Sequence, residues 1–182
     1  MMMQYSPVYC SVLYLKTNLK TQLVIAASIL IGYYVLLAFV PVPGIGEANF
    51  EKGTNLAAWL DNLVLNGHLW SVSKTWDPEG ILSTLPAITT GLFGVLVGVY
   101  LKRKEIDPAT KIAWLFSVGV FATLAGLIWD LQFPINKALW TSSYVLYAGG
   151  LASIGLALCY WIIDVQGYKK LTTPFVVYGV NA

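Results

Sequence analysis

Four long stretches without a single charged side chain dominate this sequence. They cover approximately residues 21–40, 80–101, 112–129 and 140–163. About 20 apolar residues cross the hydrocarbon core of a bilayer, where every backbone N–H and C=O group must be hydrogen-bonded within its own segment, and this selects helices. The pattern therefore predicts an all-α, polytopic transmembrane helical bundle.

Two shorter apolar segments, residues 3–15 and 171–182, look like parts of further spans. We therefore expect residues 1–182 to form a single transmembrane domain within a larger bundle, with the remaining N-terminal helices of the full protein as partners. Small residues such as Gly91, Gly94 and Gly98 recur along the spans and allow helices to approach closely in lipid. This spacing suits a compact bundle and is also compatible with a homo-oligomer.

The composition excludes several other classes of protein. Hydrophobic residues make up 57% of the chain and charged residues only 11%, whereas soluble domains are about 25% charged. The net charge is +2 and the cations are spread among loops, so we expect no nucleic-acid partner. Cys10 and Cys159 lie in separate apolar segments without CxxC spacing, which predicts two buried thiols and no metal site.

The distribution of Lys and Arg predicts how the chain is oriented. These residues favour short loops on the cytoplasmic side of a membrane. A cytoplasmic N-terminal side places eight of the eleven cations in the inner loops 16–20, 102–111 and 164–170. The outer loops are then 41–79 and 130–138. We expect an integral protein of a bacterial inner membrane.

The first outer loop, 41–79, contains a helix-like pattern of its own. Thr54 or Asn55 is suited to cap a helix that runs to Leu65. Its predicted apolar face consists of Leu56, Trp59, Leu60, Leu63 and Val64. Asp61 and Asn62 lie opposite that face. This short amphipathic helix is expected on the outer membrane surface or over the mouth of the bundle.

Candidate site residues gather in the predicted outer loops. They are His68, Asp77, Glu79, Asn136, Lys137 and Trp140. A carboxylate beside an imidazole is able to perform general-base chemistry. Structural roles compete with this interpretation, because Asp77 and Glu79 are also placed to cap the second span, and His68 is equally suited to hold a loop.

A basic run on the predicted inner side is the second candidate. Lys102, Arg103 and Lys104 form a positive cluster that would attract a phosphate-bearing cofactor. The preference of cations for cytoplasmic loops explains the same cluster without any ligand.

Several motifs, most of them in the outer loops, resemble one known family when they are taken in order. They are Asn55-Leu-Ala-Ala-Trp-Leu-Asp61, His68-Leu-Trp70, Asp77-Pro-Glu-Gly-Ile-Leu-Ser-Thr84, Pro134-Ile-Asn-Lys-Ala-Leu-Trp140-Thr-Ser-Ser143, Asp164-Val-x-Gly167 and Pro174-Phe-x-x-x-Gly-x-Asn181. Together they resemble the heparan-α-glucosaminide N-acetyltransferase family, as a bacterial homologue. The resemblance covers residues 20–182 and corresponds to the C-terminal half of the family's usual length.

The resemblance implies a transmembrane acyltransferase that transfers an acetyl group from cytoplasmic acetyl-CoA to an amino sugar on the extracytoplasmic side. In that family the histidine usually assigned as catalytic lies in an earlier outer loop, before residue 1 of this chain, and His68 matches a different position. The resemblance therefore assigns no catalytic residue here and implies that the chain alone is inactive. The six outer candidates are expected to shape the acceptor side.

Two alternatives remain open from the sequence. The first is a sugar-related transporter, for example for N-acetylglucosamine, without acyl chemistry. The second is a noncatalytic membrane scaffold. The absence of charged residues from all four complete spans argues against an ion-coupled transporter.

Overall fold

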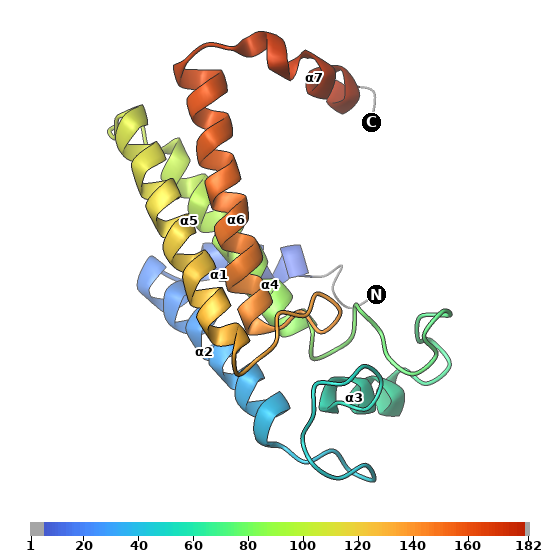
Figure 1. The fold of residues 1–182 in the computed structure, drawn as a ribbon. Helices are drawn as coiled ribbons and strands as arrows, with labels where there is room; N and C mark the ends of the chain where they lie inside the picture. The colour runs from blue at the N-terminus through green and yellow to red at the C-terminus, as the bar shows by residue number, and fades with distance from the viewer. Residues whose placement is uncertain (1–5, 181–182) are drawn as a thin grey trace.

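The computed structural model describes residues 6–180. Every regular element in that range is helical (Figure 1). The elements are α1 (Ser6–Lys16), α2 (Leu19–Phe39), α3 (Leu56–Val64), α4 (Thr84–Lys102), α5 (Pro108–Asp130), α6 (Ser142–Tyr160), the π-helical turn η2 (Trp161–Val165), the 3₁₀ turn η3 (Lys169–Thr172) and α7 (Thr173–Val180). The predicted all-α bundle is confirmed.

Four helices within the described residues are long and apolar enough to cross a membrane. They are α2, α4, α5 and the continuous α6–η2 unit, Ser142–Val165. Figure 1 shows them alternating in direction, with α3 at one end of the bundle and α7 at the other. The chain is therefore an integral membrane protein in which the 41–83 and 131–141 segments meet at one end, called here the α3 end.

Helix caps explain where two spans differ from their predicted limits. The third span begins at Pro108 and not near residue 112, because the Asp107 side chain accepts a hydrogen bond from the Thr110 N–H, and proline suits the first helical position. The second span begins at Thr84 and not at residue 80, since residues 81–83 form a turn. The expectation that Asp77 and Glu79 cap this span is therefore wrong.

The α5–α6 pair packs through glycines. A Cβ atom on Gly126 would lie 2.6 Å from the Tyr147 backbone nitrogen, and one on Gly119 would lie 2.8 Å from the Gly150 carbonyl oxygen. Only glycine permits such close backbone approach, which is the main source of helix association in lipid. At these positions small residues allow the helices to approach closely, as predicted.

The terminal segments are shorter helices. In α1, the Cys10 thiol is buried against α4 and donates a hydrogen bond to the Ile88 carbonyl oxygen at 3.2 Å. Cys159 is exposed on the outside of α6, so the prediction that it is buried is wrong. Of the two predicted partial spans, residues 3–5 and 181–182 lie outside the described residues.

The α3 helix forms as predicted but turns a different face inward. The Asn55 side chain caps it by accepting a hydrogen bond from the Ala58 N–H at 3.0 Å. It buries Ala57, Ala58 and Asp61, whereas Leu63 and Val64 of the predicted apolar face are 64% and 57% exposed. The reason is that the Asp61 carboxylate accepts hydrogen bonds from backbone N–H groups of the next loop, and the helix face that carries Asp61 is therefore buried.

Close packing at Gly126 makes a direct prediction. Gly126→Ala should destabilise the protein by about 1–3 kcal/mol, because the added methyl group meets the α6 backbone. Gly155→Ala, on an α6 surface with no atom within 4 Å, should instead stabilise it by about 0.5–1 kcal/mol. Thermal unfolding in detergent, followed by circular dichroism, measures both. Equal effects of the two variants would contradict the packing argument.

Candidate functional site

An open pocket of about 600 Å³ lies at the α3 end of the bundle. It is formed by three loops that are far apart in the sequence. Its lining consists of Lys52, Trp70, Trp76, Pro78, Glu79, Ile135, Asn136, Lys137, Ala138 and Trp140. The volume is in the range of small-molecule sites, and the lining combines apolar rings with a few polar groups, as binding sites do.

One wall is the 134–141 turn, which is organised by the Thr141 hydroxyl. This hydroxyl accepts a hydrogen bond from the Asn136 N–H at 3.0 Å and donates one to the Pro134 carbonyl oxygen at 3.0 Å. The Asn136 side-chain oxygen accepts a bond from the Ala138 N–H at 2.9 Å. The backbone between Pro134 and Thr141 is thereby closed into a compact turn that presents Asn136 and Lys137 to the pocket.

Trp140 connects this wall to the bundle. Its backbone adopts φ +51°, a conformation that is uncommon for residues other than glycine and clusters at functional sites. The indole N–H donates a hydrogen bond to the Thr90 hydroxyl of α4 at 3.1 Å. The ring also makes an edge-to-face contact with Tyr144, with centroids 5.3 Å apart. The tryptophan is therefore locked in position.

The opposite wall is the segment that leads into α4. The Asp77 carboxylate accepts a hydrogen bond from the Glu79 N–H at 2.8 Å and so shapes the turn rather than a helix end. The Trp70 and Trp76 rings meet edge to face at 5.9 Å, and the Lys52 ammonium lies 5.9 Å above the Trp76 ring. This wall contributes two indoles and the Glu79 carboxylate.

Asp61 supports the site in a way that the sequence analysis missed. Its side chain is 2% exposed and accepts hydrogen bonds from the Ile81 N–H at 2.9 Å and from the backbone of Asp77. Burial raises the pKa of the Asp61 carboxyl to about 6, and the negative charge of Asp77 adds to the rise, while the backbone donors oppose it. Two features of the sequence could have indicated this role. Asp61 lies at helical spacing from Ala57 and Ala58, and the facing loop contains a glycine, Gly80.

Four of the six predicted outer candidates meet in the pocket: Glu79, Asn136, Lys137 and Trp140. Asp77 lies in the wall but outside the lining. His68 does not join them: it is exposed in the turn after α3, next to Gly67 (φ +83°), and is not part of the pocket lining. Within residues 6–180, no three His, Cys, Asp or Glu side chains gather in a way that could hold a metal ion.

The basic candidates lie at the opposite end of the bundle. Lys102, Arg103 and Lys104 are exposed where α4 ends. Between the two ends, a groove of about 380 Å³ runs along α4 and α6 from Thr90 to Leu101. Its lining is mostly apolar and small. The three basic residues are not part of that lining.

These features define a polytopic helical membrane protein with a tryptophan-rich pocket at one end of its bundle. Two proteins named as N-acetyltransferases are similar to it in sequence. Human heparan-alpha-glucosaminide N-acetyltransferase is 30% identical in an alignment of 183 positions that covers 85% of this chain, and the mouse protein of the same name is 28% identical in an alignment of 178 positions that covers 82%. The resemblance to this N-acetyltransferase family is confirmed.

The match covers only part of each relative. The chain spans 28% of the human protein and 27% of the mouse protein, less than the half that the sequence analysis expected. No model of a protein family matches the chain.

The buried Asp61 carboxyl predicts a pH dependence of stability. Because its folded pKa of about 6 exceeds the ordinary 3.8, the folded state binds more protons between these values, and stability rises as the pH falls through this window. Between pH 7.5 and pH 5 the gain should be about 1 kcal/mol. Thermal unfolding in detergent measures it.

The variant Asp61→Asn should lose this gain, whereas Glu47→Gln in the exposed part of the loop should keep it. The titratable neighbours of Asp61 are Asp77 in the facing loop and Tyr33 of α2. If the stability of Asp61→Asn depends on pH in the same way as that of the wild type, another group is responsible for the dependence.

Proposed function

We propose that this chain forms the acceptor side of a membrane acetyltransferase that moves an acetyl group from cytoplasmic acetyl-CoA to an amino sugar on the extracytoplasmic side. The α3 end then faces outward from a bacterial inner membrane. The observation that carries this proposal is the pocket itself, whose lining combines three indoles with a carboxylate, an amide and two ammonium groups. Its relatives are N-acetyltransferases of a glucosaminide, which supports the same reading.

The pocket suits an amino sugar chemically. The apolar C–H face of a pyranose ring packs against indole rings, and Trp70, Trp76 and Trp140 provide three of them. A protonated amino group pairs with a carboxylate, which is the role we assign to Glu79. Asn136 and Lys137 are placed to hydrogen-bond the sugar hydroxyls.

The opposite end suits the donor. Lys102, Arg103 and Lys104 provide a positive cluster that attracts the phosphates of coenzyme A. The groove along α4 and α6 then offers the acetyl-bearing arm a path toward Thr90, whose hydroxyl binds Trp140 at the pocket.

The reaction transfers one acyl group. The ammonium group bound by Glu79 first loses one proton to solvent. The neutral amine then attacks the thioester carbonyl carbon, the N–C bond forms as the C–S bond breaks, and the thiolate takes up the second proton that the nitrogen loses. The histidine that the resemblance implies as catalytic is proposed to lie elsewhere in the full protein. Other helices of the full protein would therefore complete the catalytic site, and His68 is not assigned that role.

The groove also bears on the transporter alternative. A passing sugar would need hydrogen-bonding partners for its hydroxyl groups, because their desolvation costs several kcal/mol. The groove lining offers the side-chain hydroxyls of Thr90 and Ser153 among apolar residues. An acetyl group has one polar atom, its carbonyl oxygen, and its desolvation therefore costs less than that of a sugar with several hydroxyl groups. Acetyl transfer is therefore the better-supported proposal, and a scaffold gives no reason for the pocket.

The test is transfer of a labelled acetyl group across a membrane. The full protein, reconstituted in vesicles with labelled acetyl-CoA on the basic side and glucosamine on the α3 side, should produce labelled N-acetylglucosamine only in the compartment that holds glucosamine. Vesicles without protein are the control. Uptake of unmodified sugar without acetyl-CoA would support the transporter. If neither acetyl transfer nor sugar uptake is observed, the scaffold is supported.

Glu79→Gln separates recognition of the amine from general sugar binding. Removing the negative charge should weaken glucosamine binding by about tenfold or more, as expected for a lost charge-assisted hydrogen bond. N-acetylglucosamine has no positive charge, so its binding should change by about twofold at most. Calorimetric titration of both sugars measures the difference, with Glu47→Gln as the matched control. Equal losses for both sugars would contradict the assigned role.

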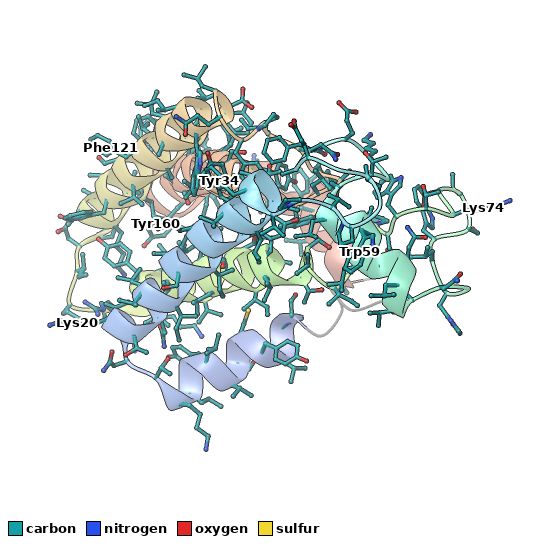
Figure 2. The ribbon with its side chains drawn as sticks, turned by 90° about the horizontal axis from the view of Figure 1, so that it is seen from below. Lys20, Tyr34, Trp59, Lys74, Phe121 and Tyr160 are labelled. Carbon is teal, nitrogen blue, oxygen red and sulfur yellow. The ribbon has the colours of Figure 1, made fainter. Side chains whose placement is uncertain are left out.

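The proposed orientation has its own test at Lys74, which projects away from the bundle on the loop beyond α3 (Figure 2). In a background with Cys10→Ala and Cys159→Ser, a membrane-impermeant thiol reagent added outside intact cells should label Lys74→Cys. Lys104→Cys should react only after the cells are opened. The reverse pattern would invert the topology and overturn the proposed sidedness.

A further inference from the structure

We propose that α3 is a positioning clip for the acceptor pocket, in which two adjacent side chains, Asp61 and Asn62, hold both ends of the 75–81 wall segment. This inference deepens the proposed function and rests on it for its kinetic test. The geometry of the clip is independent of any reaction.

Asp61 holds the C-terminal end of the wall. Its carboxylate accepts the Ile81 N–H at 2.9 Å and a further bond from the Asp77 backbone. Gly80 makes this approach possible, because a Cβ atom there would lie only 2.0 Å from the Asp61 Oδ2 atom. The buried carboxylate thus binds the wall just before it enters α4.

Asn62 holds the N-terminal end of the same segment. Its side-chain amide donates a hydrogen bond to the Thr75 carbonyl oxygen and another to the Ala58 carbonyl oxygen of its own helix at 2.9 Å. The Thr75 hydroxyl oxygen also lies close to Gly53, where a Cβ atom would be 3.1 Å away. Both ends of the segment are therefore tied to the region around α3.

The pocket-lining residues Trp76, Pro78 and Glu79 lie between these two anchor points. The α3 helix itself contributes no residue to the pocket lining, so its effect on a ligand must pass through the wall. It is a firm base for that purpose, since Ala57 belongs to the buried cluster of Tyr33, Leu37 and Phe133. Asp61 and Asn62 are thus positioning residues and not catalytic ones.

Steady-state kinetics of the full protein tests the clip. Asp61→Ala and Asn62→Ala should each raise the KM for glucosamine by about tenfold, with kcat and the KM for acetyl-CoA within about twofold of wild type. Asp61→Asn keeps one acceptor oxygen and should recover part of the loss. Loss of folded protein would lower the apparent kcat at constant KM, and that outcome would overturn the proposal.

Gly80→Ala provides an independent variant, because its methyl group displaces the Asp61 carboxylate without removing any polar group. It should reproduce the KM effect of Asp61→Ala. Glu47→Gln removes a carboxylate from the same outer loop away from the clip and should leave all three constants within about twofold. A normal glucosamine KM in Gly80→Ala would contradict the clip.

Hydrogen exchange tests the clip without relying on catalysis. In Asp61→Ala, amides in peptides covering residues 75–81 should exchange at least about tenfold faster, while the 134–141 turn and α5 keep their protection. Faster exchange throughout the chain, or none in 75–81, would overturn the clip. Faster exchange confined to 75–81, in a protein whose wild type transfers no acetyl group, would support the clip and refute the proposed function.

Discussion

The need to satisfy backbone hydrogen bonds in lipid governs this molecule. It confines the long apolar segments to helices and leaves irregular backbone only at the ends of the bundle. The α3 end carries two long irregular segments, 41–55 and 65–83, whose polar groups are satisfied largely by side chains such as Asn49, Asn62 and Asp61. The pocket exists because side-chain hydrogen bonds make these loops rigid where secondary structure does not.

Small residues serve two purposes in the bundle. Gly119 and Gly126 let α5 and α6 approach until backbone atoms touch, and this close pair fixes the 131–141 connection between them. A Cβ atom added at Gly94 or Gly98 would meet no atom within 4 Å, and these glycines instead line the groove beside α6. Glycines on one helix thus allow tight packing and glycines on another leave open space, and the difference depends on which helix lies opposite.

The sequence predicted those features that depend on a single segment. Runs of uncharged residues identified the four spans, and the pair Thr54 and Asn55 identified the start of α3, because length and capping are local properties. The inward turn of Asp61 could not be predicted, since it depends on N–H donors at Ile81 and Asp77, 16 to 20 residues away. The place of His68 likewise depends on the turn after α3, in which its side chain is exposed and does not line the pocket.

Both walls of the pocket are attached to the first turns of α4. The 75–81 wall runs directly into this helix and is clamped at Ile81, while the 134–141 wall reaches it through the hydrogen bond from Trp140 to Thr90. Two loops that are about 55 residues apart therefore share one rigid support, and a shift of α4 would move both together. Since α4 also lines the groove that leads toward Lys102, the helix physically connects the pocket to the basic end of the protein.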